Sequence, residues 1–168
     1  WDHKKLSKQG WPENDLGRRF GDINLYEIFE IHGNFDYYWM CEPDVFFHHI
    51  SAKDFFTEFD SNEDDYLAVN IKERDKFWNW FKHASVINRK VFSSSFGLVR
   101  LSKNAINFLH NQRMKLLSFY RNKGISLQLF PNDEGFVNTI LKNSDNFTCN
   151  SIDRFRPELF EFFDSDPL

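Results

Sequence analysis

The pattern of apolar and polar positions along the chain predicts strands that alternate with helices. Short apolar runs bounded by polar or turn residues are typical of buried strands. Such runs predict strands at 37–41, 66–70, 91–101 and 147–152. Serines and Gly97 interrupt the third run. Pro43 has no main-chain N–H to donate, so we expect the first strand to end near Glu42.

Between these runs, apolar residues recur at helical spacing behind a residue that can cap a first turn. The expected helix starts are Asp22, Ser51, Ser102, and Asn132 or Asp133. Gly33 and Gly124 fall where the first and third helices should end. The segment "KFWNWF", 76–81, fits neither period.

Strands that alternate with helices indicate a layered α/β fold. We expect one domain, 1–168, with 37–42 and 66–70 as central strands of its sheet. Their apolar runs are too continuous for a sheet with one solvated face, so helices should cover both faces.

Composition narrows the possible functions. The 168 residues carry 21 basic and 25 acidic side chains, a formal charge of −4 with no general nucleic-acid signal. No apolar run approaches the ~20 residues of a membrane helix, and no signal-peptide pattern opens the chain. Cys41 and Cys149 lack metal-ligand spacing, which favours free thiols in a reducing compartment. Because the chain begins at Trp1, we expect a fragment, and its 21 Phe residues predict an aromatic core.

The stretch "FDYYWMCEPDVFF", 35–47, holds the main candidate for chemistry. Glu42 and Asp44 stand two residues apart in an extended segment, so their side chains can point to one place. Two close carboxylates repel each other unless one is protonated or a cation lies between them. Mg²⁺ commonly takes one or two carboxylates together with phosphate and water. His48 or His49 would be an additional ligand, whereas in a purely structural reading Asp44 caps a turn and Glu42 is only exposed.

The same stretch, followed by "SAKDFFTEF" and "DDYLAVN", resembles bacterial glycosyltransferases of the GT-A fold that act on capsular or lipopolysaccharide sugars. Further similar pieces occur in the same order: "WNWF", "FGLVRLSKNAINFL", "NDEGFVNTIL" and "RFRPE". The resemblance covers roughly residues 20–157, and the order of the motifs carries it. It implies a GT-A-like (Rossmann-like) mixed sheet flanked by helices.

The resemblance also implies a site. An acid–x–acid motif ending a strand would hold Mn²⁺ or Mg²⁺ against the diphosphate of a nucleotide-sugar donor, here through Glu42 and Asp44. The chain departs from the family in having Glu42-Pro43-Asp44 rather than two aspartates. Only 41 residues precede Glu42, so we expect the N-terminal nucleotide-binding strands to be absent and the fragment to be inactive alone.

The resemblance implies that Glu134 is the catalytic base, because an inverting transferase needs a carboxylate to take the proton of the acceptor hydroxyl. Asp133 is the alternative base or a simple helix cap, and Glu134 is alternatively only a partner for the helix dipole. Of the remaining candidates, the resemblance implies donor binding by Arg18 and Asp22, and the alternative for the arginine is a solvated patch. Trp80 and Arg100 are assigned to acceptor binding, or to the core and the surface.

Three functions remain open at this point. The first is a metal-dependent glycosyltransferase of polysaccharide biosynthesis that transfers a sugar from a nucleotide-sugar to a glycan or lipid-linked acceptor. The second is a non-catalytic carbohydrate-binding or scaffold domain of the same fold, and the third is another metal-assisted enzyme that cuts a phosphate bond. For the first we expect a cytoplasmic protein, compatible with peripheral association at the inner membrane.

Overall fold

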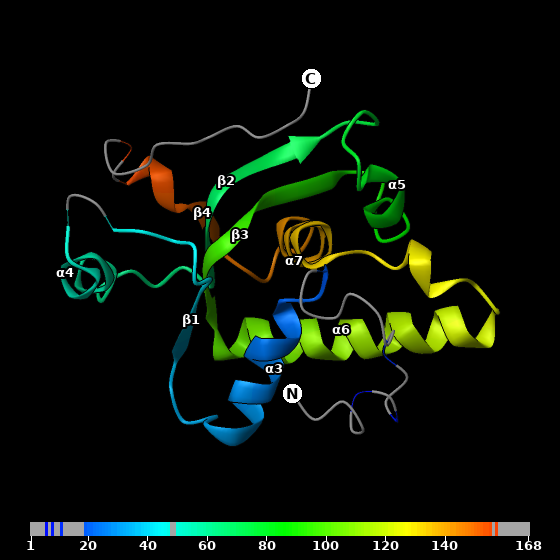
Figure 1. Cartoon of the computed structure of the whole chain (residues 1–168), viewed down its shortest axis with the longest axis horizontal. Helices are drawn as coiled ribbons and strands as arrows, with labels where there is room; N and C mark the ends of the chain where they lie inside the picture. The colour runs from blue at the N-terminus through cyan, green and yellow to red at the C-terminus, as the bar shows by residue number, and fades with distance from the viewer. Residues whose placement is uncertain are drawn as a thin grey trace.

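A computed structural model describes residues 6, 8, 11, 19–47, 50–155 and 157. In the described part of the chain the elements are, in order, α3 (Asp22–Ile31), β1 (Tyr37–Cys41), α4 (Ala52–Thr57), β2 (Tyr66–Arg74), α5 (Phe81–Ala84), β3 (Val91–Ser102), α6 (Lys103–Asn122), the 3-10 turn η1 (Leu127–Leu129), α7 (Asp133–Lys142), β4 (Cys149–Ser151) and the 3-10 turn η2 (Ile152–Arg154). The fold is therefore α/β, as expected from the sequence (Figure 1).

The described strands form one mixed sheet in the order β1-β3-β2-β4. β3 is antiparallel to both β1 and β2, while β2 and β4 are parallel. The expectation that 37–42 is a central strand is wrong, because β1 lies at one edge of this sheet. Its run is apolar because both of its faces are covered: Tyr38 and Met40 pack with the core on one face, and Trp39 packs on the other.

β2 extends past the predicted 66–70, and its pairing with β3 is irregular where that prediction ended. The register changes after Ala68, and Asn70 takes a positive φ of 58°. Beyond this point two side chains accept hydrogen bonds from the main chain of β2. Asp153 Oδ1 accepts the N–H of Asn70, and Ser151 Oγ accepts the N–H of Ile71. Polar groups near β4 thus replace ladder hydrogen bonds that the irregularity removes.

Helices cover both faces of the sheet, as predicted (Figure 1). On one face, buried side chains of α3, α6 and α7 pack with those of β1, β2 and β3. On the other, the aromatic residues of α4 and of the segments around it pack against Trp39, Leu67 and Leu98. The prediction of an aromatic core is confirmed most clearly on this second face.

The two helices that matter most for the candidate site begin as their caps dictate. Ser102 Oγ accepts the N–H of Ala105 at the start of α6, and Gly124, with φ of +62°, follows its end. At α7 the cap is Asn132, whose Oδ1 accepts the N–H of Gly135, so Asp133 is the first helical residue. No described helix is long and apolar enough to cross a membrane.

Two local expectations need correction or completion. Asp22 does not cap the first helix, because the N-cap position is Gly21 and Asp22 is already inside α3. The ambiguous segment 76–81 forms turns that lead into the four-residue helix α5.

Candidate functional site

Glu42 and Asp44 lie in the tight turn that follows β1. The N–H of Glu42 donates to the carbonyl of Gly97 at 2.7 Å, and the N–H of Val45 donates back to the carbonyl of Glu42 at 3.1 Å. Both acidic side chains are exposed. The β1–β3 pairing therefore continues to Glu42 and presents the acidic pair at the end of the edge strand.

The charge of Asp44 acts on the Glu42 carboxylate. Partial burial raises the pKa of Glu42, and the negative charge of Asp44 raises it further. The pKa of the neighbouring Cys41 thiol is raised by burial and then by both carboxylates. A cation beside two like charges offsets their repulsion, and carboxylate oxygens are ligands that suit a hard divalent ion such as Mg²⁺ or Mn²⁺.

Gly97 lies beside the Glu42 carboxylate. A Cβ added at Gly97 would lie 3.4 Å from Glu42 Oε2 and 3.6 Å from Val45, which is ordinary van der Waals contact. Among the described residues there is no group of three or more His, Cys, Asp or Glu side chains that could hold a metal ion. His48 and His49, the additional candidates, lie outside the described residues.

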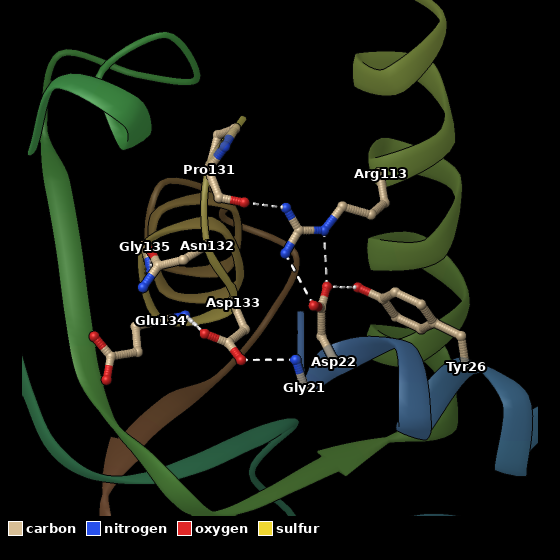
Figure 2. Close-up of polar contacts among 9 residues, drawn as sticks. All are labelled: Gly21, Asp22, Tyr26, Arg113, Pro131, Asn132, Asp133, Glu134 and Gly135. Atoms are coloured by element: carbon tan, nitrogen blue, oxygen red, sulfur yellow. Dashed lines mark hydrogen bonds and ion pairs between the residues drawn. The ribbon is translucent and has the colours of Figure 1, made fainter. Parts of the chain in front are cut away.

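Asp133 and Glu134 differ in their surroundings although they are neighbours in the first turn of α7. Asp133 is 6% exposed, and its two oxygens accept the N–H of Gly21 at 2.7 Å and of Glu134 at 2.8 Å. Burial, followed by the charge of Asp22, raises the pKa of Asp133 to about 7. Glu134 is half-buried, and its carboxylate points away from Asp133 and Gly21 (Figure 2).

A chain of contacts connects the start of α7 with the end of β1. A Cβ placed on Gly21 would lie 2.9 Å from Asp133 Oδ2, 3.7 Å from Met40 and 3.8 Å from Phe96. Met40 is two residues before Glu42 in β1, and Phe96 is next to Gly97, which contacts Glu42. The first turn of α7 thus lies on the same face of the sheet as Met40, close to the end of β1. The predicted separation of Glu134 and Glu42, on the order of 10 Å, stays a prediction.

Asp22 is engaged in a buried network rather than exposed to a ligand. It is fully buried and forms an ion pair with Arg113, with Nε to Oδ2 at 2.8 Å and Nη2 to Oδ1 at 2.9 Å. The hydroxyl of Tyr26 also donates to Asp22 at 2.6 Å (Figure 2). This placement argues against the expected donor contact by Asp22. Arg18, its expected companion, lies outside the described residues.

Arg100 is also placed differently from the acceptor contact we expected. It is 2% exposed, and its terminal nitrogens donate to three main-chain carbonyls and one side chain in the loop after α4. Its guanidinium lies 4.3 Å from the ring centre of Tyr37. Arg100 therefore holds the loop that leads into β2, which is a structural role.

Trp80 retains a partly open ring and lies close to α7. It is half-buried, with the guanidinium of Arg19 at 5.1 Å from its ring and the ring of His83 at 5.1 Å. The neighbouring Trp78 approaches the first turn of α7, because its Cη2 would be 3.2 Å from a Cβ on Gly135. Trp78 thus lies beside the first turn of α7, in which Glu134 stands.

Sequence reasoning did not identify Arg113 or Gly21. The signal for Arg113 was present: it lies between Leu109 and Leu117 at helical spacing, on the apolar stripe of α6, where a cation needs a buried partner. Gly21 offered no such signal, because its close approach to Asp133 joins positions 112 residues apart.

Comparisons of the chain with protein-family models, with curated proteins and with solved structures find no match.

Proposed function

We propose that this chain carries part of a metal-dependent glycosyltransferase domain of the GT-A type, which transfers a sugar from a nucleotide-sugar to a glycan or lipid-linked acceptor. One observation carries the proposal. The acidic pair Glu42 and Asp44 ends β1 near the sheet face on which α7 begins, and Glu134 stands in the first turn of α7. Together with the motif order in the sequence, this favours one site with a metal-binding end and a proton-accepting end.

In this proposal each candidate residue has a separate role in the transfer reaction. A divalent cation bound by Glu42 and Asp44 would offset the negative charge of the donor diphosphate, including the charge that develops on it as the leaving group. Glu134 accepts the proton of the acceptor hydroxyl while its oxygen forms a bond to the anomeric carbon and the bond to the diphosphate breaks. Trp80 offers a partly open aromatic face to a sugar ring of the acceptor.

Asp133 is a poor choice for the proton acceptor, although its pKa of about 7 alone would suit a base. Both of its oxygens are held by main-chain N–H groups, and its side chain is buried, so an acceptor hydroxyl has no approach to it. Glu134 is the more open of the two carboxylates, which is why the proposal assigns the base to it.

The metal role is tested by calorimetric titration of the full-length protein with nucleoside diphosphates and nucleotide-sugars, with and without Mn²⁺. We expect binding that depends on Mn²⁺, and Asp44→Asn should weaken it at least about tenfold because one of two charged ligands is lost. Asp60→Asn is the matched control, since Asp60 is also an exposed aspartate, in the turn after α4. Equal binding by Asp44→Asn and the parent would exclude the metal role.

The role of Glu134 is tested in the full-length enzyme with the donor found by that titration. Glu134→Gln keeps the shape of the side chain but cannot accept a proton, so donor affinity should be unchanged while transfer falls by about 10²–10⁴-fold. Glu63→Gln, an exposed glutamate, serves as control. Near-normal transfer by Glu134→Gln would remove the residue as the base.

A non-catalytic carbohydrate-binding domain is the second candidate. The observation in its favour is the group of open aromatic rings near α5: Phe77 is 81% exposed, and Trp78 and Trp80 are half-buried. Such rings bind sugars with or without turnover. Binding of glycans that is independent of Mn²⁺, combined with an absence of nucleotide binding, would favour this candidate over a transferase.

A further inference from the structure

Two segments far apart in the sequence are tied together beside the proposed base. Arg19 Nη2 donates to the carbonyls of Gln128 and Phe130, at 3.2 Å and 2.6 Å. Two residues later, the N–H of Gly21 donates to Asp133. The segment 19–22 is therefore held along the stretch that leads into α7.

The ion pair of Asp22 and Arg113 completes this connection. Arg113 reaches Asp22 with two nitrogens and donates from Nη1 to the carbonyl of Pro131 at 2.7 Å (Figure 2). Its guanidinium also lies 3.7 Å from the ring centre of Phe136 in α7. Arg113 thus holds Asp22, next to Gly21, and Pro131, two residues before Asp133, so the hydrogen bond between Gly21 and Asp133 is flanked by a buried network.

Asp133 is the one carboxylate beside this network that touches both segments without a cation as its direct partner. Oδ2 accepts the N–H of Gly21 and Oδ1 accepts the N–H of Glu134. An ionised carboxylate can accept both bonds. Protonation places an O–H donor on one oxygen and removes the negative charge, so the N–H bond to that oxygen is weakened.

We propose that Asp133 is a positioning residue, whose ionised carboxylate ties Gly21 to the first turn of α7 and thereby fixes the main chain from which Glu134 reaches the site at the end of β1. The assignment of Glu134 rests on the proposed function, whereas the tie itself does not. Protonation of Asp133 weakens these hydrogen bonds and loosens the first turn of α7 from segment 19–22.

The surroundings of Asp133 place this change near neutral pH. Burial is the main cause that raises its pKa to about 7, and the nearby negative charges of Asp22 and Glu134 add to it. Arg113 from α6 is paired with Asp22, and Tyr66 from β2 is a buried, un-ionised phenol whose pKa is raised by burial. The side chains of β1 and β3 nearest to a Cβ on Gly21 are the apolar Met40 and Phe96.

Amide hydrogen exchange of the full chain, followed residue by residue by NMR between about pH 5.5 and 8.5, tests the tie. After correction for the intrinsic pH dependence of exchange, the Gly21 amide should be about tenfold better protected above pH 7 than below it. The Ala105 amide, which donates to the non-titrating Ser102, is the internal control. Protection of Gly21 that is the same at both ends of this range would overturn the proposal.

Asp133→Asn supplies the matched variant, since the amide has one acceptor oxygen and cannot ionise. Its Gly21 or Glu134 amide should show the low protection at every pH, and full protection of both would also overturn the proposal. If the variant does not fold, the pH series on the unaltered chain still decides. Because neither measurement needs a substrate, the tie can fail while the transferase proposal stands, and the reverse.

If transfer activity is found, the positioning role predicts a kinetic effect that a purely structural role does not. Asp133→Asn should lower kcat without changing the KM for the donor, and it should remove the part of the pH–rate profile that changes near pH 7. If the fall in kcat/KM only matched the fall in the fraction of folded protein, and the pH profile did not change, Asp133 would have a purely structural role.

Discussion

Substitution of Gly21 by Ala, which adds one methyl group, tests the packing around the candidate site. Its φ of −56° and ψ of −27° suit any residue, so the usual effect of Gly→Ala would be stabilisation by about 0.4–1 kcal/mol. Here the added Cβ would meet Asp133 Oδ2 at 2.9 Å, and that oxygen cannot retreat without losing its hydrogen bond to Gly21. Steric contact and conformational entropy therefore predict opposite signs.

We expect the steric term to prevail, so Gly21→Ala should destabilise the protein by about 1–3 kcal/mol in urea denaturation. Gly97→Ala is the control, because its Cβ would meet Glu42 Oε2 at 3.4 Å, an ordinary contact. A Gly21→Ala variant as stable as the parent would mean that Asp133 is free to move away, which would weaken the case for a tight hydrogen bond.

Among the helices, α6 holds its neighbours through Arg113. This fully buried side chain pairs with Asp22 of α3 and lies over Phe136 of α7, so three helices meet at one cation. Removing one partner of a buried ion pair leaves the other charge without compensation, which commonly costs 3–5 kcal/mol. Replacing both partners avoids that penalty.

Asp22→Asn and Arg113→Met should therefore each destabilise the protein by about 3–5 kcal/mol, and the double variant should lose clearly less than the sum. Urea denaturation of the four proteins gives the coupling. The exposed pair of Lys103 and Asp36 is the control, and Asp36→Asn should leave the denaturation midpoint unchanged. If the losses of stability in the two single variants added up to the loss in the double variant, Asp22 and Arg113 would not belong to one shared network.

Local and non-local features were not equally predictable from the sequence. The start of α6 at Ser102 and its end before Gly124 follow from residues next to the helix ends, so both were predicted. The edge position of β1 was not, because strand order depends on pairing between distant segments, and an apolar run looks the same at an edge that helices cover. Asp22 was misread as a cap because its partner Arg113 lies 91 residues away.

The candidate site shows the same division. Glu42 and Asp44 were recognised together because they stand two residues apart, and the structure places both at the end of β1. Neither the hydrogen bond of Asp133 to Gly21 nor the use of Arg100 to hold a loop could be read from neighbouring residues, since each joins segments more than 35 residues apart.

For the molecule as a whole, Asp133 adds a pH dependence whose sign can be worked out. In the unfolded chain an aspartate titrates near its ordinary value of 3.8, while burial raises the pKa of Asp133 to about 7 in the fold. Between these values the native state holds a proton that the unfolded state has released, so the free energy of unfolding falls as pH rises. The stability of the fold therefore falls with rising pH, whereas the strength of the hydrogen bond between Gly21 and Asp133 increases with it.

We expect the stability of the parent minus that of Asp133→Asn to fall by on the order of a few kcal/mol as pH rises from about 5 to 8, since only the parent must bury a charge. Urea denaturation at several pH values measures this difference. His83 contributes the opposite slope, because burial and Arg19 lower its pKa and its protonation at low pH disfavours the fold. That contribution is the same in both proteins and cancels in the difference. A difference that is flat across this range would contradict a pKa of about 7 for Asp133 in the fold, and with it the dependence of the Gly21 hydrogen bond on pH.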